Sequence, residues 1–334
     1  MHSDSSPNDQ AMEQPDPVLL HDWHPAFYSQ DLPAETALPL ELLGQNLVVW
    51  RDEKKLHAWR DLCLHRGTKL SLGKVSRCRL VCPYHGWEYN DEGRCVKIPA
   101  HPEQTPPDKA RVKTYQVEEA GGLVWVSLGN PSTSPPVLPE FEDRSFRMVA
   151  CGPYEFQAAA PRVVENFLDV AHLAFVHDGL LGDSEHPELP DYQVKSDRSG
   201  ITATDISIYQ PDPDGTGKGS RVTYTYRVTR PFHTYLEKNT APDRFVLFLG
   251  VCPHNKLRST SFMIIGMNYG HDIPLSQLRE FQDRIVAQDK PIVESQRPEL
   301  LPLDLAEELH LRSDRTAIAY RKWLRELGLQ FGTA

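Results

Sequence analysis

The 334-residue sequence lacks the features that would place it in a membrane or on nucleic acid. No apolar run approaches the roughly 18–20 residues needed to cross a bilayer, so no membrane-spanning helix is expected. The polar, acidic N-terminus has no apolar signal-peptide core, and residues 1–20 are expected to form a disordered leader. Because the net charge is −10, the chain has no basic surplus to neutralise phosphates, which argues against a nucleic-acid partner.

A dinucleotide-binding motif is also absent, since no Gly-rich phosphate loop follows a strand-like segment. Cysteine is scarce: there are six, and only Cys63 and Cys82 stand in a motif. The other four are expected to be small buried hydrophobic residues: Cys78, Cys95, Cys151 and Cys252. If the protein uses electrons from NAD(P)H, they must therefore reach it through another protein.

The motif around the first two cysteines is the most informative part of the chain. The pattern C-x-H at residues 63–65 is followed by C-x-x-H at residues 82–85, and a Gly follows each His within two residues. Two thiolates suit one iron of a [2Fe–2S] cluster, and two imidazoles suit the other. Zinc also accepts two Cys and two His, but zinc fingers usually pair Cys with Cys and His with His. The predicted cluster ligands are therefore Cys63, His65, Cys82 and His85.

A second metal site is indicated by an apolar segment that is predicted to be helical from about residue 162 to 176. Asp169 and His172 are three residues apart and share a helix face, whereas His172 and His177 lie about 140° apart on an ideal helix. Both His can bind one metal only if the helix distorts or ends between them, and Gly179 favours an end. An acid inside an apolar helix is costly unless it is used, which favours a metal site over an ordinary core helix.

Two His ligands call for a carboxylate, as in the 2-His-1-carboxylate sites of non-haem iron(II) enzymes. A second helix is predicted from about residue 275 to 295, and its apolar stripe contains a single acid. The stripe consists of Leu278, Phe281, Ile285, Asp289, Ile292 and Val293. Asp289 is the predicted third ligand, since Asp283 and Glu294 fall off the stripe. Asp169 is better placed as an outer partner of His172.

The chain divides at a Pro- and Ser-rich segment. Residues 40–129 contain short strand-like runs with the two Cys/His motifs in turns between them, and Gly121-Gly122 predicts a hairpin. The expected organisation is a domain over residues 21–130, a linker over 131–140 and a second domain over 141–334. The second domain combines the two helices with strand-like stretches at 201–209, 221–228, 245–251 and 261–267.

The two Cys/His motifs, the pattern N-x-x-D-x-x-H-x-x-x-x-H at residues 166–177 and a late Asp together resemble the Rieske non-haem iron oxygenase α subunits. The resemblance runs from Trp23 to Leu327. It implies an α+β fold, in which an N-terminal all-β Rieske domain precedes a helix-grip catalytic domain with an antiparallel sheet and flanking helices. Residues 95–102, 313–315 and 320–324 resemble short members that hydroxylate saxitoxin precursors, and toluenesulfonate methyl-monooxygenases are more distantly similar.

The resemblance also implies an assembly and residue roles. Such enzymes form head-to-tail homotrimers, in which the cluster of one subunit serves the iron of the next. By position, His85 faces the neighbouring subunit and Asp169 bridges it to the iron ligand His172. Asn166 matches an outer-shell amide near the iron.

The implied cofactors are the [2Fe–2S] cluster and mononuclear Fe(II), with O₂ as co-substrate and a ferredoxin or flavin reductase that passes on electrons from NAD(P)H. Respiratory Rieske proteins carry a disulfide at positions that are Thr68 and Tyr84 here, so that bridge cannot form. Its loss favours the reduced cytoplasm as the location.

The predicted function is the terminal oxygenase of a monooxygenase system that hydroxylates or oxidatively demethylates a small cyclic or aromatic substrate. Ring dihydroxylation to cis-dihydrodiols is the alternative within the enzyme class, and a Rieske electron-transfer protein without oxygenase activity is the alternative outside it. Aromatic residues that could line a substrate pocket, although such residues more often form core, are Tyr209, Tyr224, Tyr226, Phe232, Tyr235 and Phe248.

Overall fold

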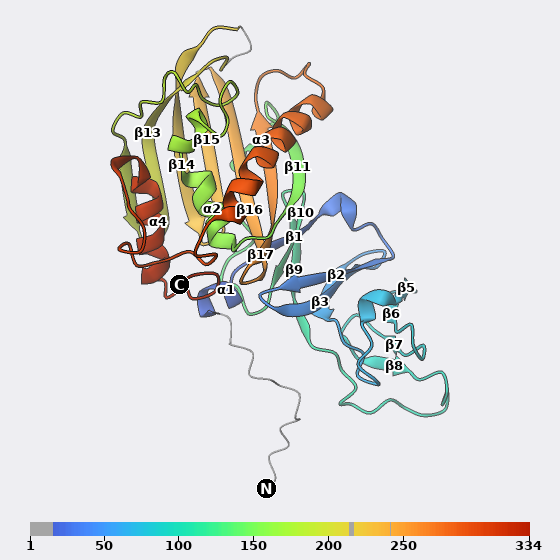
Figure 1. The fold of residues 1–334 in the computed structure, drawn as a ribbon. Coiled ribbons are helices and arrows are strands. Elements are labelled where there is room, and N and C mark those ends of the chain that lie inside the picture. Colours follow the sequence, from blue (N-terminus) through green and yellow to red (C-terminus); the bar gives the residue numbers. More distant parts are fainter. Residues whose placement is uncertain (1–15, 214–216, 241) are drawn as a thin grey trace.

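Three antiparallel sheets organise the described part of the chain, which comprises residues 16–213, 217–240 and 242–334 of a computed structural model (Figure 1). Two of the sheets form an all-β N-terminal part, and the third carries the long helices. The predicted α+β class and the order of the two parts are therefore confirmed. No helix among the described residues is both long enough and apolar enough to cross a membrane.

The N-terminal part consists of a six-stranded and a four-stranded sheet. The larger sheet has the order β1-β10-β9-β4-β3-β2 and consists of β1 (His24–Tyr28), β2 (Thr36–Leu42), β3 (Gln45–Arg51), β4 (Leu56–Arg60), β9 (Thr114–Ala120) and β10 (Leu123–Ser127). The smaller sheet lies between β4 and β9 in the sequence and consists of β5 (Lys74–Ser76), β6 (Arg79–Val81), β7 (Glu88–Tyr89) and β8 (Cys95–Lys97). The predicted hairpin at Gly121-Gly122 is confirmed, because it joins β9 to β10.

The C-terminal part is one seven-stranded sheet covered on one face by helices (Figure 1). Its strands, in the order β11-β17-β16-β15-β14-β13-β12, are β11 (Arg147–Phe156), β12 (Gln193–Asp197), β13 (Gly200–Gln210), β14 (Ser220–Arg230), β15 (His233–Thr240), β16 (Asp243–Asn255) and β17 (Arg258–Met267). The covering helices are α2 (Ala160–Leu168), α3 (Leu275–Ser295) and α4 (Arg315–Glu326). The four predicted strand-like stretches and the second predicted helix are confirmed.

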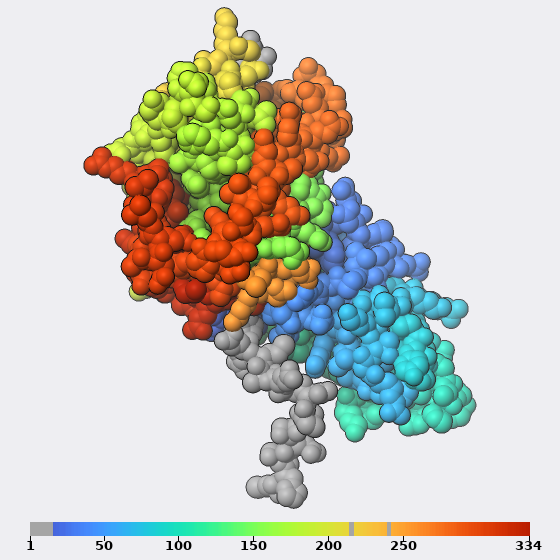
Figure 2. Space-filling model, in the orientation of Figure 1, coloured from blue at the N-terminus to red at the C-terminus, as the bar shows by residue number. Residues whose placement is uncertain are grey.

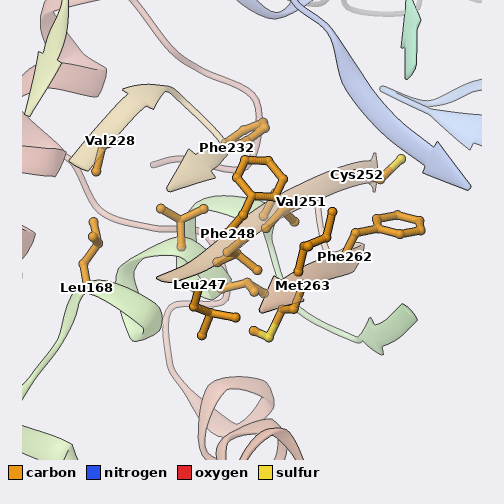
Figure 3. Close-up of a cluster of buried hydrophobic side chains, with 14 of the residues drawn as sticks. Leu168, Val228, Phe232, Leu247, Phe248, Val251, Cys252, Phe262 and Met263 are labelled. Atoms are coloured by element: carbon orange, nitrogen blue, oxygen red, sulfur yellow. The ribbon is translucent and has the colours of Figure 1, made fainter. Parts of the chain in front are cut away.

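Alternation of apolar and polar residues explains why the large sheet buries one face under the helices. In β14, Val222, Tyr224, Tyr226 and Val228 are buried, and the residues between them are more exposed. Figure 3 shows part of the resulting core, where Leu168 of α2 faces side chains from β14 and β16, such as Val228 and Leu247. The core leaves room for a cavity, which contains the second candidate site.

The two parts pack directly against each other, as Figure 2 shows where the blue N-terminal lobe adjoins the lobe coloured from green to red. The Tyr28 hydroxyl donates to the Cys151 carbonyl at 2.6 Å, and the Leu43 N–H donates to the Pro253 carbonyl at 2.8 Å. The chain crosses from one part to the other between β10 and β11, where Pro139–Phe141 form a 3₁₀ turn with Glu140 buried. The expected linker segment is therefore packed against the protein along part of its length.

The leader predicted over residues 1–20 extends too far, because the structure orders its last residues. Residues 1–15 lie outside the described residues, but Pro17–Leu20 form a short helix, α1, in which Leu19 is fully buried. The Asp16 carboxylate accepts hydrogen bonds from the N–H groups of Gln330 and Phe331. These contacts with the C-terminal segment hold the chain in place from Asp16 onward.

One cysteine also departs from the prediction. Cys78 is exposed, and it lies in the turn between β5 and β6 with a φ of +57°. The other three cysteines without a motif are buried, as expected. A two-residue turn between short strands leaves the Cys78 side chain no core to enter.

Candidate active site

Two loops of equivalent geometry hold the N-terminal Cys/His motifs. In each loop the Cys N–H donates to the carbonyl five residues later, from Cys63 to Thr68 at 2.8 Å and from Cys82 to Trp87 at 2.9 Å. In each loop a Gly N–H four residues after the Cys closes the turn onto the Cys carbonyl. Both glycines have φ near +70°, which disfavours any other residue. The matched turns place the two motifs as a symmetric pair.

The thiols of these loops are buried, whereas the imidazoles are more exposed. Cys63 and Cys82 are each 2% exposed, whereas His65 is partly exposed and His85 is exposed. The two His rings lie 4.4 Å apart between centroids, and Trp87 stacks on His65. A cluster held here would have its Cys-bound iron in the protein and its His-bound iron at the surface.

The spacing of these four residues also separates a cluster from zinc. Ligand atoms of one zinc ion lie within about 3.8 Å of one another, because each bond is about 2.0–2.3 Å long. Among the described residues, no three ligand atoms of the two loops lie within 4.8 Å of one another. The wider set suits a two-iron cluster.

Tyr89 is a partner of the first loop that the sequence analysis missed. Its hydroxyl lies 3.2 Å from the Cys63 Sγ and 3.3 Å from the Leu64 N–H. Burial is the main reason that the pKa of Tyr89 is raised, so the hydroxyl stays protonated and donates to a thiolate. A hydrogen bond to a cluster thiolate raises the reduction potential. The sequence signals this role of Tyr89 only by a Tyr four residues after His85, and that signal is too weak to identify the residue.

The helix predicted over residues 162–176 ends earlier than expected. α2 stops at Leu168, and Asp169 adopts an extended conformation with its carboxylate accepting the N–H of Ala171 at 2.9 Å. A 3₁₀ turn, Ala171–Ala174, then carries His172. The side chain of Asp169 thus competes with the helix for backbone donors and breaks it. The break lets His172 and His177 point at one place, which a continuous helix would prevent.

The structure brings His172, His177 and Asp289 together. The Nε2 atoms of the two His lie 3.3 Å apart, and Asp289 Oδ1 lies 3.4 Å from His172 Nε2 and 3.1 Å from His177 Nε2. Donors bonded to one ion at about 2.1 Å would be separated by about 3.0–3.4 Å. Among the described residues, this is the only group of three such ligand atoms within 4.8 Å.

The tautomer of His177 tests whether this triangle fits a metal. His177 Nδ1 lies 2.9 Å from Gln288 Oε1, which can only accept, so Nδ1 carries a hydrogen. In the neutral ring the lone pair is then on Nε2, the atom that faces a carboxylate oxygen of Asp289, so both atoms could bind one cation. A divalent iron ion fits this donor set of two imidazoles and one carboxylate. Sequence periodicity could not single out Gln288.

Two further residues support the triangle. Asp169 Oδ2 lies 3.6 Å from His172 Nδ1, and Asn166 Nδ2 approaches Asp289 Oδ1 at 3.5 Å. Burial lowers the pKa of His172, but the hydrogen bonds with Asp169 and Asp289 outweigh it and raise that pKa to about 9. Without a metal, His172 therefore holds a proton in this site. Metal binding would displace it.

The triangle lines a cavity of about 250 Å³ between α3 and the sheet. Of the predicted stripe on α3, Leu278, Phe281, Ile285 and Asp289 line the cavity. Ile292 is 47% exposed and departs from the predicted stripe, whereas Val293 is buried without lining the cavity. The walls of the cavity are mainly apolar. They also include Phe167, Leu236, Leu247, Met263 and Ile265.

Two of the six predicted pocket aromatics are in the right place. Tyr224 and Tyr226 line the cavity, whereas Tyr209, Phe232, Tyr235 and Phe248 are not among its lining residues. The reason is the period of a strand: Tyr235 and Phe248 lie directly opposite each other in β15 and β16, so they share the sheet face that is turned away from the helices. Hydrophobicity alone does not tell one face from the other.

Comparison with known proteins places these sites in a family. Residues 22–116 match the Rieske [2Fe-2S] domain, and residues 156–330 match the vanillate O-demethylase oxygenase C-terminal domain. The methylxanthine N1-demethylase NdmA of Pseudomonas putida is 36% identical over 92% of this chain and 89% of its own. The methylxanthine N3-demethylase NdmB of the same organism is 31% identical over 93% and 90%. A structure of NdmA with caffeine is similar, with a TM-score of 0.81, 35% identity and coverage of 92% of this chain and 91% of that one.

Proposed function

The chain belongs to the Rieske oxygenases with a vanillate O-demethylase-type catalytic domain, and on this basis we propose that it removes methyl groups from ring nitrogens of a small heterocycle. It is the terminal oxygenase of a monooxygenase system that takes electrons from NAD(P)H through a separate reductase. The observation that carries the finer proposal is the triangle of His172, His177 and Asp289 on the wall of a mainly apolar cavity. Relatives that cover nine-tenths of the chain bear the names of methylxanthine N-demethylases.

We assign the [2Fe–2S] cluster to Cys63, His65, Cys82 and His85, and the mononuclear iron to His172, His177 and Asp289. When bound, the iron would activate O₂ with electrons from the cluster, as open positions beside a three-ligand site permit. Gln288 fixes the tautomer of His177, and Asp169 orients His172. The apolar walls exclude bulk water and hold the substrate's methyl group toward the three ligands.

The overall reaction balances as a monooxygenation. One O₂, two electrons and two protons convert an N–CH₃ group to N–CH₂OH and water. The carbinolamine then breaks its C–N bond, releasing formaldehyde and leaving N–H on the ring. Attack at a carbon without a heteroatom would stop at the alcohol, so the position of the substrate decides between demethylation and hydroxylation.

We further propose that the protein is a head-to-tail homotrimer in the cytoplasm. His85 is exposed, and the Asp169 side chain is 39% exposed although it touches a nearly buried His172. Both groups are thus available at the surface of one subunit. In a ring of subunits, Asp169 would connect His85 of one subunit with His172 of the next.

The test is turnover with a surrogate reductase. Iron-replete protein, NADH and either caffeine or theobromine should consume O₂ and release about one formaldehyde per O₂, with the demethylated purine as the other product. A cis-dihydrodiol without formaldehyde would instead establish a dioxygenase. If the cluster is reduced normally but no substrate in a broad panel supports O₂ consumption, the protein is an electron carrier.

A further inference from the structure

β14 contributes two tyrosines to the wall of the cavity. Tyr224 and Tyr226 are two residues apart in the strand, so their side chains leave the same face of the sheet. Each is 4% exposed, and both line the cavity that contains the ligand triangle. Their rings meet edge to face at 6.2 Å, and Tyr226 packs in the same way on Phe167 at 5.7 Å. The two rings are therefore fixed in position.

The hydrogen bonds around Tyr224 leave its hydrogen unused. Gln210 Nε2 donates both to the Leu181 carbonyl at 3.2 Å and to the Tyr224 hydroxyl at 2.7 Å. The Leu181 carbonyl can only accept, so it fixes which side of the Gln210 amide carries the hydrogens. The Tyr224 oxygen is consequently an acceptor toward Gln210. Its own hydrogen must find a partner elsewhere, and no described residue supplies one.

Tyr226 is in the same situation. Its hydroxyl makes no hydrogen bond to any residue in the part of the chain that the structure describes, although the side chain is buried in a mainly apolar wall. Burial is the main reason that the pKa values of both tyrosines lie above their ordinary value, so both hydroxyls stay protonated. A hydroxyl without a protein acceptor is free to donate to a ligand bound in the cavity.

We propose that Tyr224 and Tyr226 select the substrate by donating hydrogen bonds to two ring carbonyl oxygens, so that the enzyme takes N-methylated cyclic amides or ureas and rejects N-methyl rings without carbonyls. This inference rests on the proposed function and adds to it the groups that the substrate must carry. The apolar walls pack on the flat ring, and the two donors fix its rotation in the plane. Rotation in the plane decides which methyl group faces the ligand triangle.

The experiment compares two purines that differ in their carbonyls. Caffeine has two ring carbonyls, whereas 7-methylpurine keeps the fused ring and one N-methyl group but has none. Binding of each is measured by calorimetry with iron-replete protein under anaerobic conditions, so that no turnover occurs. The variants are Tyr224→Phe and Tyr226→Phe, and the matched control is Tyr235→Phe. The control removes a hydroxyl from the opposite face of the same sheet, where it donates to Glu140 at 2.9 Å.

Wild-type protein should bind caffeine at least about 100-fold more tightly than 7-methylpurine, because 7-methylpurine has no carbonyl oxygen to accept from the two tyrosine hydroxyls. Each of the two cavity variants should weaken caffeine binding about 10-fold and should not weaken 7-methylpurine binding, because Phe removes the donor that this purine leaves unpaired. Tyr235→Phe should alter neither. Equal weakening of both purines, no weakening of either, or equal affinity of the wild type for the two would overturn the inference.

Formaldehyde release from the same preparations separates this inference from the proposed function. Tyrosine-dependent caffeine binding without formaldehyde would keep the carbonyl selection and refute demethylation. Formaldehyde release from caffeine that is insensitive to both Phe variants, with unchanged affinity, would keep demethylation and refute the selection.

Discussion

The two proposed histidine ligands are oriented by different kinds of residue. His177 is held by an uncharged amide from α3, since Gln288 accepts from its Nδ1. His172 is held by a carboxylate, Asp169, which lies at the broken end of α2. Burial raises the pKa of Asp289, but hydrogen bonds with the two His outweigh it and lower that pKa, so the carboxylate stays charged. The donor set keeps one negative charge against a dication.

Replacing Asp289 with Ala should remove the mononuclear iron and leave the cluster in place. The variant should contain about one iron fewer per subunit than the wild type and show no measurable turnover, because two imidazoles alone bind iron weakly. Elemental analysis and the visible spectrum of the cluster measure the two sites separately.

Asp283→Ala is the matched control on the same helix. Asp283 accepts a hydrogen bond from Tyr154 outside the cavity, so this variant should keep its iron and its activity. Full activity in Asp289→Ala, or loss of the iron in Asp283→Ala, would contradict the choice of Asp289.

His233 makes stability depend on pH at the boundary between the two parts. The ring is 1% exposed, lies edge to face with Trp125 at 5.3 Å, and has no hydrogen-bond partner on either nitrogen among the described residues. Burial is the main cause that lowers the pKa of His233 to about 3. The charge of Asp22 raises this pKa, and the charges of His24 and Arg230 lower it. The unfolded chain takes up the proton near pH 6.5, and the folded protein does so only near pH 3.

The stability that His233 contributes is therefore complete above about pH 6.5 and falls as the pH drops toward 3. Between pH 7 and pH 5 the loss should be about 2 kcal/mol. Denaturant unfolding of wild type and His233→Gln at both pH values measures it, because Gln cannot be protonated. The difference in stability between the two proteins should shrink by about that amount at pH 5. An unchanged difference would show that His233 is not buried in its neutral form.

At the scale of elements, a buried ion cluster ties the C-terminal helix to the helix that precedes the iron site. Arg321 of α4 donates to both carboxylate oxygens of Glu165 of α2, at 2.5 and 2.7 Å. Glu308 accepts from Arg321 at 2.5 Å and from Arg162 at 2.9 Å. Glu165 directly precedes Asn166, so this cluster determines where the last turn of α2 ends relative to the sheet.

Removing the central cation should destabilise the protein strongly. Arg321→Met leaves two carboxylates next to each other with one remaining Arg, and breaking such a buried pair costs about 3–5 kcal/mol. Chemical denaturation followed by circular dichroism gives the free energy of unfolding.

Arg111→Met is the control, because its pair with Glu92 is 54% and 65% exposed and should change stability by less than about 1 kcal/mol. Similar small losses in the two variants would mean that α4 is held by its apolar face alone.

At the scale of the whole molecule, one chain contains an electron-accepting site and an oxygen-activating site in separate sheets. The second Cys/His loop joins β6 to β7 of the small four-stranded sheet, and the first lies on the connection from β4 to that sheet. Figure 1 shows the small sheet at the end of the N-terminal part away from α2, α3 and α4. The ligand triangle lies under those helices. A ring of subunits would bring the sites together in pairs, and Asp169 is the group that such an arrangement would use.

Asp169→Asn should uncouple the two sites while leaving both metals bound. The change keeps the size of the side chain and removes its charge, so the cluster should still be reduced by the partner reductase. Single-turnover reoxidation of the cluster with substrate and O₂ should slow at least about 100-fold. Stopped-flow absorbance follows that step.

Normal reoxidation and product formation in iron-replete Asp169→Asn enzyme would sink the bridging role. Loss of the mononuclear iron would instead move Asp169 among the ligands. Sedimentation of wild type and variant gives the oligomeric state in the same buffer.

The sequence by itself determined the chemistry of the sites and the class of the fold. C-x-H and C-x-x-H predict the cluster ligands, because thiolates and imidazoles at such spacing have few other uses. A single acid in the apolar stripe of residues 275–295 predicts Asp289 as the third iron ligand, because periodicity reports which helix face is buried. Strands and the hairpin were equally readable, since alternation and Gly-Gly turns are local signals.

Tertiary structure alone decided where α2 ends, which residues orient the ligands and what lines the cavity. The break at Asp169 depends on one side chain competing for a backbone donor, and hydrophobic periodicity gives no information on that competition. Gln288 and Tyr89 act through contacts with residues that are distant in the sequence. Tyr226 lines the cavity and Tyr235 does not, because the strands place them on opposite faces of one sheet, and the composition of a strand does not say which face the helices cover.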